Sequence, residues 1–269
     1  MMSVTPSRLS LNQMTVDQWG VRDAAAACKR HGVEWIALWR HKVAGIGVRE
    51  AAAIVRGEGL RVSSLCRGGM FPAATAEERA LKIQDNKLAI DEAVELGTSV
   101  VCLVCGAAPD RDVQGARQMI EDGIAAVVPY ARERGVRLGI EPLHPMFCSD
   151  RSAICSLRQA NDLAERLDVG VVIDVYHVWW DPDLYPQIER AGKRILGFHV
   201  NDWVAPPVDH LKGRVMMGDG VIEIKRMREA VDAAGYEGPI EVEIFNQVLW
   251  DSPGDEVMAK MVERFALTV

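Results

Sequence analysis

The chain has 269 residues, 49% of them hydrophobic, and its 38 acidic against 31 basic side chains give a net charge of −7. This balance argues against nucleic acid as a partner, because affinity for a phosphate backbone rests on clustered positive charge. The apolar run at 100–108 is too short to span a bilayer, and Met1 to Met14 lacks the basic start and apolar core of a targeting segment. We therefore expect one cytoplasmic domain, residues 1–269, without a membrane partner.

Six cysteines raise the question of disulfides, but a chain of this size can bury a sufficient core without cross-links. We expect reduced thiols. The segment Cys102-Leu103-Val104-Cys105 has the spacing of a metal knuckle. It lies in a run typical of a strand, however, where a spacing of three sends the two sulfur atoms to opposite faces. Both residues are therefore predicted to be core cysteines.

Helical stretches that end in glycine alternate with short apolar runs along the whole chain. Glycine suits the left-handed conformation that ends many helices, as expected at Gly32, Gly97 and Gly135. The longest predicted helix runs from Thr75 to Leu96, and Thr75 with Glu78 forms a capping-box pattern at its start. The apolar runs predict eight strands: Leu9 to Asn12, Trp35 to Trp39, Val62 to Cys66, Val100 to Cys105, Leu138 to Glu141, Val171 to Asp174, Leu196 to His199 and Ile240 to Ile244.

Eight strands that alternate with helices indicate parallel pairing and an α/β fold. Each strand and helix together take about 34 residues, and no linker divides the chain, which favours a single (β/α)8 TIM barrel. The alternative is an open, doubly wound sheet. That fold usually carries a glycine-rich nucleotide loop after its first strand, whereas here the first strand continues into Asn12-Gln13-Met14-Thr15.

Four predicted strands carry a metal-binding type of side chain near their ends: Glu141, Asp174, His199 and Glu243. Side chains alternate between the two faces of a strand, so one face of all four strands can turn toward a common point. Any one of these residues alone also fits a solvated strand end or a helix cap. Four successive units that each end in such a residue predict a divalent-metal site, and a barrel places its chemistry at this end of its strands.

These segments resemble the xylose isomerase-like TIM barrels, and within them the sugar phosphate isomerase/epimerase group that includes ketose 3-epimerases and inosose isomerases. The resemblance covers nearly the whole chain. It is carried by these motifs: Gly139-Ile140-Glu141-Pro142-Leu143-His144-Pro145, Ile173-Asp174-Val175-Tyr176-His177, His199-Val200-Asn201-Asp202-Trp203, Met217-Gly218-Asp219-Gly220 and Val242-Glu243-Ile244-Phe245.

The resemblance implies one divalent ion held by the four residues, with Glu141 and Glu243 on opposite sides of a bound hydroxy-ketone. Carboxylates and an imidazole without thiolate suit Mn²⁺, Mg²⁺, Co²⁺ or Zn²⁺, and we take Mn²⁺ as the expected ion. An ion that bridges the carbonyl and hydroxyl oxygens stabilises the enediolate as it forms. Glu141 and Glu243 are thus the expected catalytic acid and base as well as ligands.

Five further residues near strand ends are predicted to bind the substrate: His177, Arg67, Arg214, Asn12 and Trp179. His177 resembles a histidine that contacts substrate oxygen in related enzymes, although a loop role fits equally. A surface salt bridge is the alternative for Arg67. Arg214 lies on the seventh βα loop, where barrels often hold anions, and bracing that loop is its alternative role.

At two places the sequence differs from the pattern of related enzymes, and each difference argues against one substrate or reaction. Ketose 3-epimerases carry another acidic residue six positions beyond the first Glu, where this chain has Phe147. This favours a less polar substrate, a cyclitol or a keto-glycoside over a ketohexose. Endonuclease members of the superfamily use extra histidines at the second and third strand ends, where this chain has Trp39-Arg40 and Arg67. A DNA-repair role is therefore not expected.

The sequence thus predicts a metal-dependent isomerase or epimerase of a keto-sugar or keto-cyclitol that acts by proton transfer next to the carbonyl. A lyase, either a dehydratase or a deglycosidase on a 3-keto sugar or inosose, is the first alternative, because an enediolate can also expel a leaving group. A non-catalytic sugar-binding barrel or subunit is the second. The partner is a small molecule in each case, and a homo-oligomer is left open.

Overall fold

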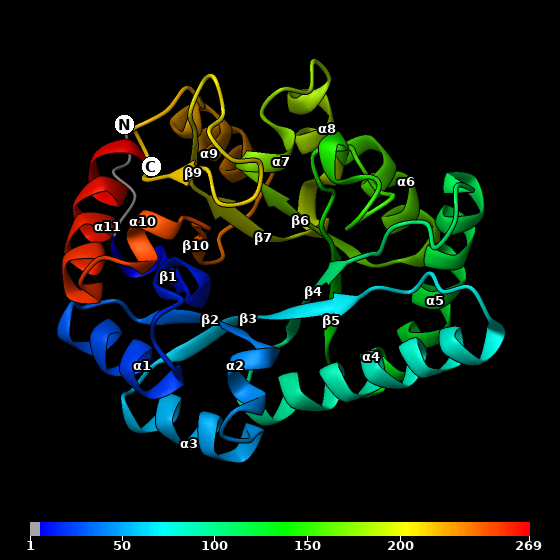
Figure 1. The fold of residues 1–269 in the computed structure, drawn as a ribbon, viewed down its shortest axis with the longest axis horizontal. Helices are drawn as coiled ribbons and strands as arrows, with labels where there is room; N and C mark the ends of the chain where they lie inside the picture. Colours follow the sequence, from blue (N-terminus) through cyan, green and yellow to red (C-terminus); the bar gives the residue numbers. More distant parts are fainter. Residues whose placement is uncertain (1–5) are drawn as a thin grey trace.

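A closed barrel of eight parallel strands forms the centre of the computed structural model, which describes residues 6–269 (Figure 1). Residues 1–5, where the segment examined for targeting begins, lie outside the described part. The order around the barrel is β1-β10-β7-β6-β5-β4-β3-β2. The strands are β1 Leu9–Asn12, β2 Trp35–Trp39, β3 Arg61–Gly69, β4 Val100–Val104, β5 Arg137–Ile140, β6 Gly170–Asp174, β7 Ile195–Val200 and β10 Ile240–Val242. The (β/α)8 TIM barrel is confirmed.

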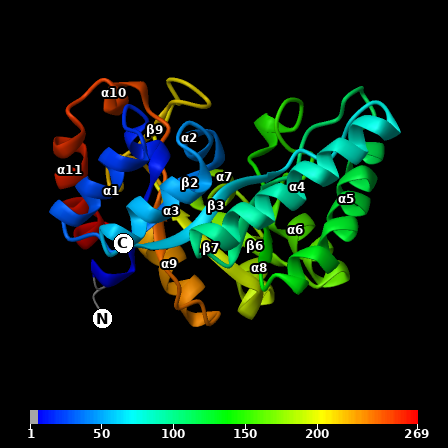
Figure 2. The same ribbon diagram turned by 90° about the horizontal axis from the view of Figure 1, so that it is seen from below.

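Longer helices surround this barrel, and most contact the next helix along the ring (Figures 1 and 2). They are α1 Val21–Arg30, α3 Val48–Gly57, α4 Ala76–Leu96, α5 Val113–Glu133, α6 Leu157–Leu167, α8 Leu184–Ala191, α9 Ile224–Ala233 and α11 Gly254–Thr268. Three short helices follow the ends of β2, β6 and β10: α2 Arg40–Ala44, α7 Val175–Val178 and α10 Gln247–Trp250. Single 3-10 turns cover η1 Pro6–Arg8, η2 Gln13–Val16, η3 Pro145–Phe147 and η4 Gly192–Arg194. No helix within residues 6–269 is both long and apolar enough to cross a membrane.

The long helix α4 begins and ends as its sequence predicts. The Thr75 hydroxyl accepts a hydrogen bond from the Glu78 amide at 3.2 Å, and the Glu78 carboxylate accepts one from the Thr75 amide at 3.1 Å. Gly97 ends the helix in the left-handed conformation, with φ of 78°. The capping box is therefore present, and it fixes where the chain leaves the barrel rim and enters the outer layer.

The two cysteines of the knuckle-like segment lie on opposite faces of β4. Cys102 packs with Cys66 and Val172 inside the barrel, whereas Cys105 belongs to the layer between strands and helices. Both thiols are free and buried, so the prediction of core cysteines is confirmed. The interior is tightly filled, because a Cβ atom on Gly139 would lie only 2.7 Å from the Val172 side chain.

The loop between β7 and α9 contains a two-stranded antiparallel sheet that the sequence reading did not include. Its strands are β8 Asp202–Trp203 and β9 Arg214–Val215. The buried Asp202 carboxylate accepts hydrogen bonds from the amides of Gly218, Gly220 and Ile222 at 2.9 to 3.0 Å. These bonds fold the loop back on itself, and the loop carries Arg214 to the mouth of the barrel.

Candidate metal centre

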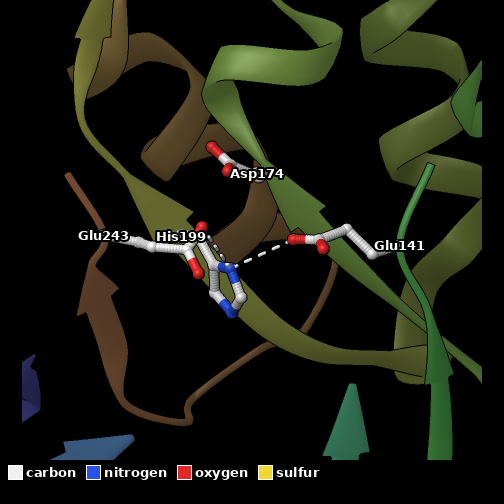
Figure 3. Close-up of side chains that lie close together, drawn as sticks. All are labelled: Glu141, Asp174, His199 and Glu243. Atoms are coloured by element: carbon white, nitrogen blue, oxygen red, sulfur yellow. Dashed lines mark ion pairs between the residues drawn. The ribbon is translucent and has the colours of Figure 1, made fainter. Parts of the chain in front are cut away.

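The four predicted ligands come together at the carboxyl ends of β5, β6, β7 and β10 (Figure 3). These strands are consecutive neighbours in the barrel, so their ends face one small volume. One donor atom from each residue lies within 4.8 Å of the others, and all four side chains are buried. The convergence expected from strand parity is present for Glu141, Asp174, His199 and Glu243.

His199 stands at the centre of this group. Its Nδ1 atom lies 3.2 Å from Oε1 of Glu141 and 3.7 Å from Oε2 of Glu243, the contacts dashed in Figure 3. Neither Nδ1 nor that Glu141 oxygen makes a hydrogen bond of acceptable geometry to another group in residues 6–269. Buried polar atoms without partners are rare, and three carboxylates with an imidazole form a donor set that suits a divalent cation. The residues present therefore fit a metal ion.

The other ring nitrogen of His199 faces a carboxylate that the sequence reading did not include. Its Nε2 atom lies 3.1 Å from Oε2 of Glu241 on β10. The hydroxyls of Ser63 and Ser64 donate to Oε1 of Glu241 at 2.8 and 2.7 Å. A carboxylate behind a histidine orients the ring and raises its basicity as a ligand. Glu241 lies two residues before Glu243 and so shares its strand face. This alternation was the sequence signal that could have placed Glu241 near the site.

Burial and charge act in opposite directions on these groups. Burial alone lowers the pKa of His199, but Glu241, Glu141 and Glu243 raise it well above its usual range. Burial raises the pKa of Glu141. Burial also acts to raise the pKa of Glu243, yet the neighbouring His199 and the charge of Arg214 leave it lowered. The cluster is thus one electrostatic unit in which His199 acts to lower the pKa of Glu141 and of Glu243 against the effect of burial.

Arg214 enters the same cluster from β9. Its Nη1 atom donates to Oδ2 of Asp174 at 2.7 Å and to Oε2 of Glu243 at 2.8 Å. The side chain is buried, with its guanidinium over the rings of Tyr176 and Phe245 at 4.6 and 4.9 Å from their centroids. Arg214 therefore links two predicted ligands, in addition to stabilising its loop.

His177 lies next to Arg214 at the start of the loop after β6. Its Nδ1 atom accepts a hydrogen bond from the His144 amide at 3.2 Å, and its Nε2 atom lies 3.3 Å from Nη2 of Arg214. Burial, together with the charge of Arg214 and against the opposing charge of Asp174, lowers the pKa of His177 to about 3. The ring is therefore neutral at neutral pH, which suits hydrogen bonding to an uncharged substrate oxygen.

A cavity of about 140 Å³ opens above Glu141, His177, Arg214 and Glu243. Pockets for drug-sized ligands start at about 300 Å³, so this one suits a single small ring or a short chain. Aromatic and aliphatic side chains form most of its wall, and two more arginines face it. The wall includes Trp39, Leu143, Phe147, Phe245, Arg67 and Arg151.

Two predicted substrate contacts lie outside the lining of this cavity. Asn12 is buried below it, where its Nδ2 atom donates to Glu241 at 3.2 Å and to Glu243 at 3.0 Å. Trp179 packs against Trp203, with ring centroids 5.6 Å apart. Asn12 therefore holds Glu243 from behind, whereas Trp179 packs against the loop that carries Trp203.

The family model of the xylose isomerase-like TIM barrel matches residues 25–266. The chain belongs to this family. Among curated relatives, L-ribulose-5-phosphate 3-epimerase UlaE of Shigella sonnei is 27% identical over 213 residues, which are 75% of this chain and 71% of that protein. The 3-dehydroshikimate dehydratase of Pseudomonas aeruginosa is 27% identical over 65% of this chain, but over only 28% of its own length.

Solved structures of similar proteins agree with the fold. A protein of Sinorhizobium meliloti 1021 is 49% identical, with a TM-score of 0.96 over 98% of this chain and 99% of that chain. The IolI protein with a bound zinc atom is 18% identical and has a TM-score of 0.85 over 97% of this chain and 99% of its own. The curated relatives thus include a sugar phosphate epimerase, and the structure of the IolI protein, which shares the fold, holds zinc.

Proposed function

We propose that this family member is a divalent-metal-dependent isomerase or epimerase of a keto-sugar or keto-cyclitol. The observation that carries the proposal is the convergence of Glu141, Asp174, His199 and Glu243 beneath a small cavity. Mn²⁺ as the preferred ion and a cytoplasmic location belong to the same proposal. The epimerases among the relatives support this class of reaction.

Glu141, Asp174, His199 and Glu243 would hold the ion, which when bound supplies Lewis-acid stabilisation of charge that develops on the substrate oxygens. Glu141 follows β5 and Glu243 follows β10, and β6 and β7 separate these strands in the barrel. The two carboxylates therefore approach the cavity from different sides (Figure 3). One can remove the proton next to the carbonyl on one face, and the other can return a proton on the opposite face.

The remaining polar groups would position the substrate. Arg214 and the neutral His177 face the cavity next to Glu243. Arg214 can donate to substrate oxygens, and so can Nε2–H of His177, because its Nδ1 already accepts from the His144 amide. Arg67 faces it from the end of β3. Trp39 and Phe245 provide an apolar wall against ring carbons, and their rings contact at 5.6 Å between centroids. Asn12 and Trp179 would support this arrangement from behind.

A lyase is the second candidate, and the name of the Pseudomonas relative, a dehydratase, favours keeping it. The same carboxylate can remove the proton, after which the carbon skeleton expels water or an aglycone in place of taking a proton back. The early steps and the residues are shared. The two reactions differ in the mass of the product.

The test is a panel of keto-sugars and inososes, each incubated in D₂O with protein loaded with Mn²⁺, Mg²⁺, Co²⁺ or Zn²⁺. Metal-dependent deuterium uptake without other loss of mass supports the isomerase or epimerase. Loss of water or an aglycone supports the lyase. A fully loaded protein that exchanges no proton of any panel member would refute both and favour a non-catalytic barrel.

A further inference from the structure

Among residues 6–269, two arginines at the cavity have no carboxylate within hydrogen-bonding distance. Arg67 makes no ion pair or hydrogen bond through its guanidinium with any described residue. The nearby Asp85 has both carboxylate oxygens bonded to Arg40 at 2.9 Å. Arg151 has its Nε atom buried without a hydrogen bond, and its ion pair with Asp150 is long, at 3.7 Å. Arginine that is half-buried in a cavity wall normally finds an acceptor.

The two side chains face the cavity from either side of one strand end. Arg67 lies in β3, and Arg151 lies in the loop that follows β5, while β4 runs between β3 and β5 in the barrel. From β4 only the apolar Val104 lines this cavity. An acceptor shared by both guanidinium groups would therefore lie over the end of β4, where no described residue supplies one.

The charges around the cavity indicate which charge a bound molecule should carry. Arg67, Arg151 and Arg214 contribute three positive charges, and the metal-binding cluster contributes the carboxylates of Glu141, Asp174 and Glu243. Glu241 adds a fourth carboxylate one layer deeper. With a divalent ion bound, the ion and Arg214 carry three positive charges among these four carboxylates, so none of the four is left over for Arg67, and Arg151 has only its long contact with Asp150. The neutral His177 does not change this balance.

We propose that Arg67 and Arg151 form an anion-binding subsite, so that the substrate carries a carboxylate or a phosphate in addition to its reacting carbonyl. This inference rests on the proposed function for the position of the reacting end, which lies at Glu141 and Glu243. The anionic group extends toward the end of β4. A planar guanidinium can form two parallel hydrogen bonds to either kind of anion, which a neutral hydroxyl cannot match.

Equilibrium binding of matched ligand pairs tests the subsite without turnover. Isothermal titration of the Mn²⁺-loaded protein compares D-ribulose with D-ribulose 5-phosphate, and shikimate with its methyl ester. At least tenfold tighter binding of the phosphate member indicates a phosphorylated substrate, and the same preference for shikimate over its ester indicates a carboxylate. Raised salt should weaken the preferred member selectively. Equal binding of charged and neutral members in both pairs would overturn the proposal.

Arg67→Gln and Arg151→Gln should each weaken binding of the preferred anion by about tenfold or more, and weaken binding of the neutral member much less. Arg22→Gln is the matched control, because Arg22 is an exposed arginine that pairs with Glu50 away from the cavity. Circular dichroism and metal content establish that each variant is folded and loaded. Anion binding that survives in the double variant would place the anion elsewhere and refute the subsite.

The two proposals fail in distinguishable ways. If the protein discriminates charged from neutral ligands but exchanges no substrate proton, the subsite stands and the proposed reaction is wrong. If neutral and charged substrates bind with the same Kd and exchange their protons at the same rate, the proposed reaction stands and the subsite is wrong.

Discussion

The Nε2 atom of His199 lies 3.1 Å from Oε2 of Glu241, on the side of the ring opposite to Glu141. Although burial opposes the ionised form of Glu241, its histidine neighbour and the two serine hydroxyls keep its pKa lowered. A charged Glu241 next to Nε2 favours a proton on that nitrogen when a metal ion replaces the proton on Nδ1. The lone pair of Nδ1 is then directed at the centre of the metal-binding cluster.

Glu241→Gln should therefore weaken metal binding by about tenfold to a hundredfold, since an amide cannot enforce this tautomer as a carboxylate does. Titration with Mn²⁺ or Zn²⁺ measures the effect. Glu237→Gln, an exposed position just before β10, is the control and should bind metal normally. His199→Ala should lose still more affinity, because it removes a ligand. Unchanged affinity in both His199→Ala and Glu241→Gln would show that the ion binds elsewhere.

Arg214→Gln should destabilise the metal-free protein by about 3 to 5 kcal/mol, because Asp174 and Glu243 lose their shared buried cation. Metal should restore most of this stability. Denaturant unfolding with EDTA and with Mn²⁺ provides the comparison. The exposed pair of Arg226 with Glu223 offers a control, and Arg226→Gln should cost about 0 to 1 kcal/mol in both states. An equal loss with and without metal would contradict this account.

Glu141→Gln and Glu243→Gln should each lower turnover by about a hundredfold or more, the usual scale of general acid and base catalysis. Each glutamine retains an oxygen that can reach the ion, so metal content should be measured alongside the rate. One of the two variants should still exchange the substrate proton with D₂O, because proton removal on one face survives. Full activity with metal bound in either variant would assign proton transfer to another group, with His177 the first to examine.

Asn86→Ala should lower stability by about 1 to 3 kcal/mol for each backbone group left unpaired. The Asn86 side chain accepts from the Gly69 amide at 2.6 Å and donates to the Gly69 carbonyl at 2.8 Å, which fixes the end of β3 beyond Arg67. Gln84→Ala, an exposed change on the same helix, should cost far less. Similar unfolding midpoints for the two variants would show that Asn86 is not important for this strand end.

Strand positions could be read from the sequence because apolar runs and glycine stops are local signals. Both β1 and β2 have the predicted bounds, and β10 ends two residues early, so that Glu243 lies just beyond it. Side-chain parity was enough to bring Glu141 and Glu243 together. Other residues of the cavity could not be predicted in this way. Arg151 lies on a long loop whose path depends on tertiary contacts, and no local sequence pattern distinguishes it from a solvent-exposed arginine.

The Asp202 turn has a thermodynamic consequence for recognition. Its carboxylate holds amides of the loop that carries Arg214, and the guanidinium of Arg214 is itself held by two carboxylates. The conformational entropy of this segment is therefore lost when the protein folds, and little remains to be lost on binding. A rigid cavity entrance of this kind should discriminate between ligands by shape and stereochemistry. The heat-capacity change on binding should then come mainly from desolvation of the ligand itself.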